Sequence, residues 1–436
     1  MRRTADAVVI GAGIIGCSVA HALASSGRSV LVVDRNPGPG QGSTSASSAI
    51  IRFNYSTLAG VATAWEAHWS WLDWEGFLGG PDKDGSLATF WRTGSLCLDA
   101  PAHDPAKVLR LFDQVGVPYD VLSPEKIRRA YPWLDPARHY PPKPVDSDAF
   151  WDEASGDIGG YVTPDSGFID DPSFAAHNLA TAAERWGVRF LFRATVSGIR
   201  RRSDRVSGVE FTDGTVVDTP VAVNVSGPAS GHVNDLAGVS GDFAVQTRPL
   251  RVETHSVPAP PGFHVGGQPG PLVADVDLGT YFRGTPSGGM LVGGAEPECD
   301  PLEWLEDPDN YNPSVTRSLY EAQVYRAARR LPELGVPNTP RGIAAVYDVA
   351  DDWIPIYDKT ALPGFYVAIG TSGNQFKNAP LVGGYLRAII DTCESGVDHD
   401  ETPACFDLPR AGINLNLSAY SRRRQPSSDS SNTVMG

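Results

Sequence analysis

The sequence of 436 residues predicts an α/β protein, and three features near the amino terminus carry this prediction. A short β-branched run at residues 7–10 is followed at once by a glycine motif at residues 11–16. A small, apolar stretch of helical spacing then continues to residue 24. A second buried strand at residues 29–33 ends at an acidic residue. This order of strand, glycine turn, helix, strand and acid is the context that makes GxGxxG a Rossmann-type dinucleotide-binding unit.

Each glycine of the motif has its own predicted task. Gly11 permits the tight turn, Gly13 lets a pyrophosphate approach the backbone, and Gly16 lets the helix touch the strand. The helix then offers its first N–H groups and the positive end of its dipole to the phosphates. Asp34 follows Gly11 by about twenty positions, where a ribose hydroxyl is read. The adjoining residues expected to line the same site are Ile14, Ile15 and Arg35.

The amino terminus also has a second interpretation. Arg2 and Arg3 precede an apolar stretch that ends at Ala24, and this pattern resembles a secretion signal. Asp6 and the three glycines interrupt the stretch, however, and the nucleotide-binding turn explains them. We therefore expect the nucleotide-binding unit rather than a cleaved signal.

Composition excludes several classes of protein. With 41% hydrophobic and 20% charged residues, the chain has ordinary globular usage. A net charge of −15 disfavours nucleic acid and anionic membrane surfaces as partners, and no apolar run reaches the ~18 residues that span a bilayer. The five cysteines are odd in number and form no CxxC pair, which predicts a reducing, cytoplasmic location. The nine histidines show no HExxH motif, so no metal site is expected.

Later segments favour FAD over NAD as the dinucleotide. Residues 40–49 are small and rich in hydroxyl groups, and Ser43, Thr44 and Ser45 can donate hydrogen bonds to a bound cofactor. The alternative is a solvent-exposed loop. Residues 221–228 and 365–374 repeat the pattern of a strand followed by a glycine turn. Three separated glycine turns that serve one long ligand fit FAD better.

Five motifs together resemble the FAD-dependent amine oxidoreductases of the D-amino-acid oxidase and sarcosine oxidase type. They are GAGIIG at 11–16, GSTS at 42–45, IIR at 50–52, NVSGP at 224–228 and GTSGNQFKNAP at 370–380. The resemblance covers about residues 5 to 400. The last motif is the most specific, and it is similar to the family pattern GxSGHGFK. Asn374 and Gln375 stand where histidine and glycine are usual, which puts in doubt what a side chain there does for the reaction.

The resemblance implies a further set of cofactor contacts. They are Ile51, Val196, Ser226, Gly227, Gly370, Ser372, Gly373, Asn374, Gln375, Phe376 and Lys377. It also implies a non-covalent FAD. Some relatives tether the flavin through a histidine just after GSTS, where this chain has Ala46. Others use a cysteine ahead of a pocket tyrosine, where this chain has residues 344–346, Ala-Ala-Val.

Five residues are candidates for the substrate pocket and its chemistry. Arg52 and Lys377 match the family's cations that bind a substrate carboxylate, and the alternative for each is an ordinary ion pair. Tyr347 aligns with a pocket tyrosine, whose aromatic face suits a cationic amine, or it is a core residue. Alternation places Tyr281 and Arg283 on one face of a strand. They either line the pocket or serve packing.

The resemblance therefore implies oxidation of the CH–N bond of an amino acid or N-alkyl amino acid. A hydride would pass to flavin N5, and the resulting imine would hydrolyse. The electron acceptor is oxygen or another carrier, because residues 289–293 lack the lysine that helps oxygen react in sarcosine oxidases. Two alternatives stay open: an FAD-dependent 2-hydroxy-acid dehydrogenase, whose substrate the same cations would hold, and a non-catalytic flavin-binding assembly protein.

The resemblance also implies a discontinuous organisation. The expected FAD-binding domain comprises residues 1–81, 151–239 and 336–407, and the α+β substrate domain comprises residues 82–150 and 240–335. The substrate domain should hold a large mixed or antiparallel sheet, with strands at 247–256, 279–283 and 290–293. Residues 408–436 form a tail, and its polar, serine-rich part at 421–436 is expected to be disordered.

Overall fold

The predicted nucleotide-binding strands lie in a six-stranded sheet. The structure, a computed structural model, describes residues 3–82, 85–101 and 104–435. In spatial order the strands are β10 (Arg189–Phe192), β3 (Val30–Asp34), β2 (Ala7–Ile10), β14 (Val221–Asn224), β22 (Phe365–Ile369) and β21 (Ile356–Lys359). All neighbours pair in parallel except β21, which is antiparallel to β22. Segments far apart in the sequence thus build one parallel sheet.

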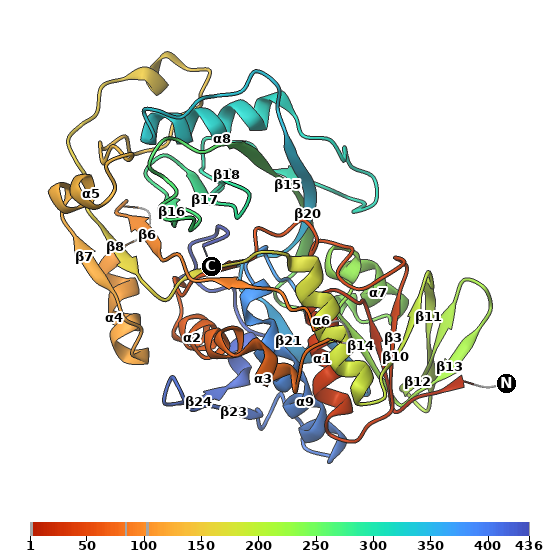
Figure 1. Cartoon of the computed structure of the whole chain (residues 1–436). Helices are drawn as coiled ribbons and strands as arrows, with labels where there is room; N and C mark the ends of the chain where they lie inside the picture. Colours follow the sequence, from red (N-terminus) through yellow and green to blue (C-terminus); the bar gives the residue numbers. More distant parts are fainter. Residues whose placement is uncertain (1–2, 83–84, 102–103, 436) are drawn as a thin grey trace.

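The two faces of this sheet are covered differently. One face carries α1 (Ile14–Ala24), α6 (Pro172–Arg185) and α9 (Ala379–Glu394). The other face carries α7 (Ser230–Leu236) and a four-stranded sheet of β1 (Arg3–Thr4), β13 (Val216–Asp218), β12 (Arg205–Phe211) and β11 (Val196–Arg202). Val9 packs against the helices and Val8 against the small sheet, because successive strand residues point to opposite faces. Figure 1 shows β11, β12 and β13 at the right-hand edge.

A nine-stranded sheet forms the other large layer. It comprises β19 (Glu303–Trp304), β15 (Thr247–Pro258), β18 (Gly289–Gly294), β17 (Thr280–Gly284), β16 (Leu272–Asp275), β6 (Ser95–Leu98), β8 (Gly160–Thr163) and β7 (Asp120–Leu122), with β20 (Gly342–Ala350) paired to β15. The pairs are antiparallel except β16 with β6, so the expected mixed sheet is confirmed. Helix α8 (Arg317–Arg330) covers one face of it (Figure 1).

Two strands of this sheet fall outside the expected segments of the substrate domain. β8 lies within residues 151–239 and β20 within residues 336–407, both of which the sequence analysis places in the FAD-binding domain. β8 pairs with β6 and β7, and β20 pairs with β15. The chain therefore crosses between the two large sheets more often than the sequence pattern indicates.

The remaining elements connect these layers. A three-stranded sheet contains β4 (Ile50–Ile51), β9 (Gly167–Ile169) and β5 (Phe90–Trp91). The other helices are α2 (Leu58–Leu72), α3 (Trp74–Leu78), α4 (Pro105–Val115) and α5 (Pro124–Ala130), with short 3-10 turns at Asp148–Trp151, Gly227–Ala229, Ser240–Asp242 and Phe376–Asn378. Thr57 and Asp104 start α2 and α4 by accepting hydrogen bonds from backbone N–H groups of the first turn.

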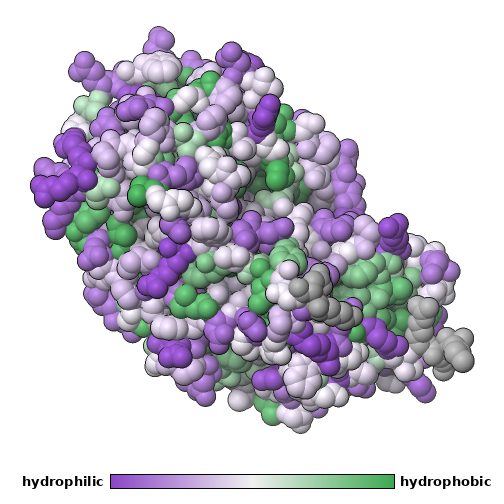
Figure 2. Space-filling view, viewed as in Figure 1, coloured by the Kyte–Doolittle hydropathy of each residue, from purple (hydrophilic) through white to green (hydrophobic). Residues whose placement is uncertain are grey.

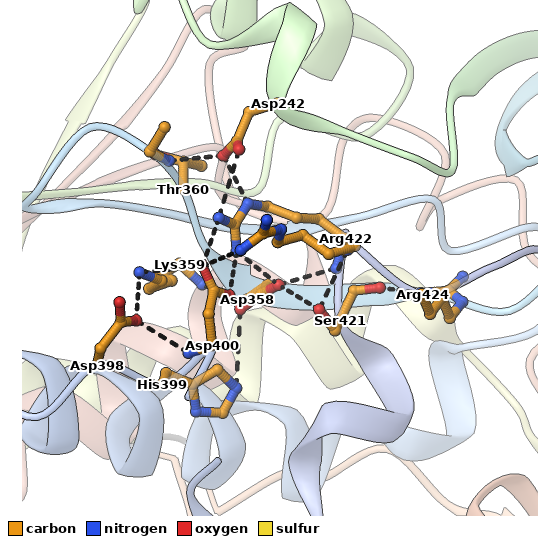
Figure 3. A network of polar contacts seen from close by, with 12 residues as sticks. Asp242, Asp358, Lys359, Thr360, Asp398, His399, Asp400, Ser421, Arg422 and Arg424 are labelled. Carbon is orange, nitrogen blue, oxygen red and sulfur yellow. Dashed lines mark hydrogen bonds and ion pairs between the residues drawn. The ribbon is translucent and has the colours of Figure 1, made fainter. Parts of the chain in front are cut away.

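The expectation of a disordered tail is wrong for residues 421–435. A hairpin of β23 (Cys405–Leu408) and β24 (Ile413–Asn416) and a 3-10 turn (Leu417–Tyr420) lead into this C-terminal segment. The Arg422 side chain is only 2% exposed and forms ion pairs with Asp242, Asp358 and Asp400 (Figure 3). Buried ion pairs between residues distant in the sequence thus fix a segment whose local composition is typical of disorder.

The surface in Figure 2 is mostly hydrophilic, and apolar side chains appear on that face in separate patches. This distribution agrees with the ordinary globular composition and the net charge of −15. The predicted site residues lie instead in the interior, where the two large sheets meet.

Candidate active site

A cavity of about 540 Å³ joins most of the predicted site residues. It runs from the first glycine turn to the nine-stranded sheet. The predicted residues that line it are Gly11, Gly13, Ile14, Ile15, Asp34, Arg35, Ser43, Thr44, Ser45, Arg52, Val196, Ser226, Gly227, Tyr281, Tyr347, Gly373, Asn374, Gln375, Phe376 and Lys377. Five predicted residues do not line it: Gly16, Ile51, Arg283, Gly370 and Ser372. Each of these five packs behind the cavity wall.

The first glycine turn closes against the neighbouring strand. Gly11 has a φ of +114°, and a Cβ there would collide with the carbonyl group of Val225. Gly16 touches the carbonyl of Gly11, so its lack of a side chain serves packing of the helix on the turn. The Asp34 carboxylate accepts hydrogen bonds from the N–H groups of Ala12 (2.7 Å) and Asn36 (2.8 Å). It borders the cavity and retains acceptor capacity for a hydroxyl group.

The serine-rich segment lies at the start of α1. Gly13 is the N-cap, in extended conformation and without a capping side chain. Thr44 Oγ1, 3.1 Å away, accepts a hydrogen bond from the N–H of Ile14 instead. Ser43 and Ser45 are exposed residues at the rim, and Ser43 donates a hydrogen bond to the carbonyl of Val346 (2.7 Å). The segment thus borders the cavity and connects α1 to β20.

The carboxy-terminal glycine motif is anchored on β20. The N–H of Gly370 donates to Oδ2 of Asp348 (2.6 Å), and Ser372 Oγ accepts from the N–H of Ala350 (3.1 Å). Burial raises the pKa of Asp348 to about 7, which the hydrogen bond from Gly370 opposes. Gly370 and Ser372 therefore shape the turn from behind, and only Gly373 onward reaches the cavity.

Two amides occupy the positions where the family usually has histidine and glycine. Asn374 and Gln375 are both buried, and Gln375 donates to Oδ1 of Asn374 (2.6 Å). Gln375 Oε1 accepts from the hydroxyl of Tyr357 (2.9 Å) and from the amide of Asn378 (2.7 Å). These contacts give the pair a positioning role: they hold the backbone of the motif in place.

Arg52 and Lys377 are buried together at the far end of the cavity. Lys377 Nζ donates to the carbonyl of Asn374 (2.6 Å) and to the hydroxyl of Tyr55 (3.2 Å). The Arg52 guanidinium lies 5.2 Å from the centroid of the Tyr55 ring. Within residues 3–82, 85–101 and 104–435, neither cation has a carboxylate at ion-pair distance. Burial lowers the pKa of Lys377 well below its usual value, and the charge of Arg52 adds to the shift.

The predicted residues of β17, Tyr281 and Arg283, differ in whether they reach the cavity. The hydroxyl of Tyr281 is 2.8 Å from Ser48 Oγ, and Arg283 Nε donates to the carbonyl of Ser48 (3.0 Å). Both side chains thus lie on one face of β17, as alternation predicts. Arg283 stacks over the ring of Phe168 at 3.9 Å and does not reach the cavity, whereas Tyr281 does. Tyr347 lines the cavity, with its ring against Gly373.

Sequence reasoning missed four residues at the cation end. Tyr55 contacts both cations, and Glu296 accepts a hydrogen bond from the N–H of Val434 (3.1 Å). The carbonyls of Val434 and Met435 accept hydrogen bonds from Arg52 at 2.6 and 3.1 Å. The tail shows no motif, and its polar composition predicts disorder. Tyr55 follows the IIR motif closely, which is the one signal that could have drawn attention to it.

The cavity suits an elongated dinucleotide. Its walls combine a glycine turn at a helix N-terminus, an acid at a strand end and a second glycine motif beside buried cations. Ala46 and residues 344–346 also line it, so the two positions used for tethering in relatives carry no nucleophile. Among the described residues, no cluster of three His, Cys, Asp or Glu side chains is arranged to hold a metal. In the same part of the chain, none of the helices is both long and apolar enough to cross a bilayer.

The chain is similar to known proteins. The family model described as "DAO: FAD dependent oxidoreductase" matches residues 6–389. The bovine (Bos taurus) FAD-dependent oxidoreductase domain-containing protein 1 is 24% identical over 432 residues, covering 90% of this chain and 81% of that protein. Sarcosine oxidase subunit beta of Rhizobium meliloti is 25% identical over 390 residues, covering 87% and 82%.

The fold itself matches a solved structure. The crystal structure of L-proline dehydrogenase from P. horikoshii superposes with a TM-score of 0.74 at 22% identity, covering 97% of this chain and 98% of that one. This likeness confirms the expected α/β architecture with a Rossmann-type unit and a second, sheet-based unit. Because the family model spans most of its length, the chain belongs to the DAO family of FAD-dependent oxidoreductases.

Proposed function

We propose that this protein oxidises the CH–N bond of an amino acid or N-alkyl amino acid. The observation that carries the proposal is the pair of buried cations, Arg52 and Lys377, which have no carboxylate partner among the described residues and share one cavity with the glycine turn. Burying unpaired charge is costly unless a ligand compensates it. A substrate carboxylate is the compensating group that a two-cation pocket favours.

Each residue then has a specific task. Arg52 offers a planar guanidinium for parallel hydrogen bonds, and Lys377 offers a point charge. Tyr55 holds both cations in place through its ring and its hydroxyl. Tyr347 and Tyr281 give the cavity aromatic walls that suit a cationic or N-methylated amine. When bound, FAD supplies the acceptor for the hydride that leaves the carbon next to nitrogen.

Two of the similar proteins, L-proline dehydrogenase and sarcosine oxidase subunit beta, are named for amine substrates, which supports an amine substrate here. The acceptor that reoxidises the cofactor is oxygen or another carrier; β18, at residues 289–294, contains no lysine. We also place the protein in the cytoplasm. All five of its cysteines lie in the described residues and are free, which supports a reducing compartment.

A substrate panel under anaerobic conditions tests this proposal. The FAD-loaded protein is mixed in turn with amino acids, N-alkyl amino acids and 2-hydroxy acids, and the visible absorbance of the flavin is followed. Bleaching by amino compounds alone supports the proposal. Bleaching by hydroxy acids alone would establish the hydroxy-acid dehydrogenase instead, and no bleaching by any compound would favour a non-catalytic flavoprotein. Either of the last two outcomes rejects the proposed reaction.

A further inference from the structure

Glu296 is a partly exposed acid close to Arg52 that the proposed function does not use. It lies two residues after the end of β18 and adopts a φ of +47°, which non-glycine residues rarely do. Such strained residues concentrate at functional sites. The hydrogen bond that the structure gives its carboxylate comes from the N–H of Val434, 3.1 Å away. A buried carboxylate needs such donors, because it has lost its water.

Glu296 lies behind Val434, the residue that donates to its carboxylate and lines the cavity. Its charge interacts with that of Arg52 and affects the hydroxyl of Tyr347. Burial raises the pKa of Glu296 to about 8, although Arg52 opposes the shift. An ammonium group placed beside it would favour the charged form further. A carboxyl group whose charge depends on its partner thus lies beside Arg52.

The backbone of Val434 joins the two opposite charges. Its N–H donates to Glu296, and its carbonyl accepts from Arg52 Nη2 at 2.6 Å. An α-amino acid carries the same two functions in the same order, because its nitrogen donates and its carboxylate accepts. The carbonyl of Met435 accepts a further hydrogen bond from Arg52 at 3.1 Å. The backbone of residues 434–435 therefore takes up the hydrogen bonds of Glu296 and Arg52 that an amino acid would need.

The stretch that carries Val434 is held less firmly than the residues before it. Arg422 fixes the start of the C-terminal segment through a buried ion pair with Asp358, among others (Figure 3). Arg424 forms an ion pair with buried Asp352. Farther along the segment, Asp429 forms an ion pair with Lys107. The Asp429 side chain is 70% exposed, and exposed ion pairs contribute little to stability. Residues 430–435 contain no charged side chain, so a substrate that displaces them has to replace the hydrogen bonds of Val434 and Met435 to Arg52 and Glu296.

We propose that Glu296 binds the amino group of the substrate while Arg52 binds its carboxylate, and that Val434 occupies this two-point site until the substrate displaces it. This inference rests on the proposed function, because it assigns the groups of that substrate. It makes Glu296 a specificity-determining residue, which distinguishes an amino acid from a carboxylate without nitrogen.

Binding titrations of the FAD-loaded protein with glycine and with acetate test the role of Glu296. The readout is the change in flavin absorbance on binding, and it does not require turnover. Glu296→Gln should weaken glycine binding by at least about tenfold and leave acetate binding within about twofold, because it removes a charge-assisted hydrogen bond to the amine. Glu296→Asp, which keeps the charge, should restore part of the preference. Glu298→Gln, at an exposed neighbour, is the matched control and should change neither.

A second pair of variants tests the competition by Val434. Val434→Pro removes the N–H that donates to Glu296, so it should tighten the binding of both ligands severalfold. Val434→Ala keeps the N–H and should therefore tighten binding much less than Val434→Pro does. Equal losses for glycine and acetate in Glu296→Gln, or unchanged binding in Val434→Pro, would overturn the inference. If no amine bleaches the flavin while these binding results hold, only the proposed reaction fails.

Discussion

The ammonium nitrogen of Lys377 lies 3.2 Å from the phenolic oxygen of Tyr55. The same nitrogen is 5.3 Å from the centroid of that ring, so the tyrosine supports the lysine both as an acceptor and through its aromatic face. Neither contact neutralises the charge. Lys377 is therefore a buried cation that loses its proton easily. The affinity of the pocket for an anion should change with this protonation.

The first prediction concerns the pH dependence of anion binding. The pKa of Lys377 is lowered from its usual 10.5, and the lysine attracts a carboxylate only while it is protonated. The dissociation constant for acetate should therefore rise with pH well before 10.5, as measured by titration of the FAD-loaded protein. Lys377→Arg keeps its charge and should remove this rise, because arginine stays protonated in proteins. An acetate affinity that stays constant up to the usual lysine pKa would contradict the prediction.

The second prediction concerns stability and Glu296. Since burial raises its pKa from 4.5 to about 8, its contribution to the free energy of unfolding is fully present below pH 4.5 and is lost as the pH rises through about 8. The Tm of the wild type should thus fall relative to that of Glu296→Gln across this range. Thermal unfolding of the FAD-loaded proteins measures the difference. Parallel Tm curves for the two proteins would show that the pKa of Glu296 is not raised in the folded protein.

The third prediction concerns the contact between Gly373 and Tyr347. Gly373 has a φ of +67°, and a Cβ at this position would overlap the Tyr347 ring. Gly373→Ala should therefore cost the backbone strain plus about 1–3 kcal/mol of overpacking, and it should weaken FAD retention. Gly396→Ala is the matched control, because Gly396 has a φ of +93° and open space around it. Urea unfolding should separate the two variants; equal losses would argue against the close contact.

The fourth prediction concerns the anchor of the C-terminal segment. Arg422→Met would remove the one cation that Asp242, Asp358 and Asp400 share among the described residues (Figure 3). Breaking buried pairs in this way costs about 3–5 kcal/mol. Arg423→Met should cost less than about 1 kcal/mol, because the Arg423 side chain is 63% exposed. Chemical unfolding checks both values, and a loss for Arg422→Met as small as that for Arg423→Met would reject the anchor.

Local patterns were sufficient for the elements near the first glycine motif. The β-branched run predicted at residues 7–10 is β2, and the strand predicted at 247–256 is contained in β15. Both follow from alternation and turn residues within a few positions. The pairing of β20 with β15 could not be seen in this way, because it brings Leu250 opposite Tyr347 across almost a hundred residues. Long-range pairing of this kind leaves no trace in a short window.

The site residues also divide into those that a local motif predicts and those that it does not. Arg52 and Lys377 were found through motifs that resemble a family, whereas Glu296 and Val434 belong to no motif. The backbone of Val434 acts through its N–H and carbonyl, which every residue possesses, so its side chain carries no signal. The tail was misjudged for a related reason. Its composition predicts disorder, but Arg422 forms ion pairs with three acidic residues that are distant in the sequence.

The most direct test of the account compares two ligands of nearly equal shape. Acetate and acetamide are titrated into the FAD-loaded wild type and into the double variant Arg52→Met/Lys377→Met. Two buried cations with no carboxylate at ion-pair distance among the described residues should bind the carboxylate at least about tenfold more tightly than the amide, and the double variant should lose that preference. Equal affinity of the wild type for acetate and acetamide would contradict the central claim that this pocket is built for an anion.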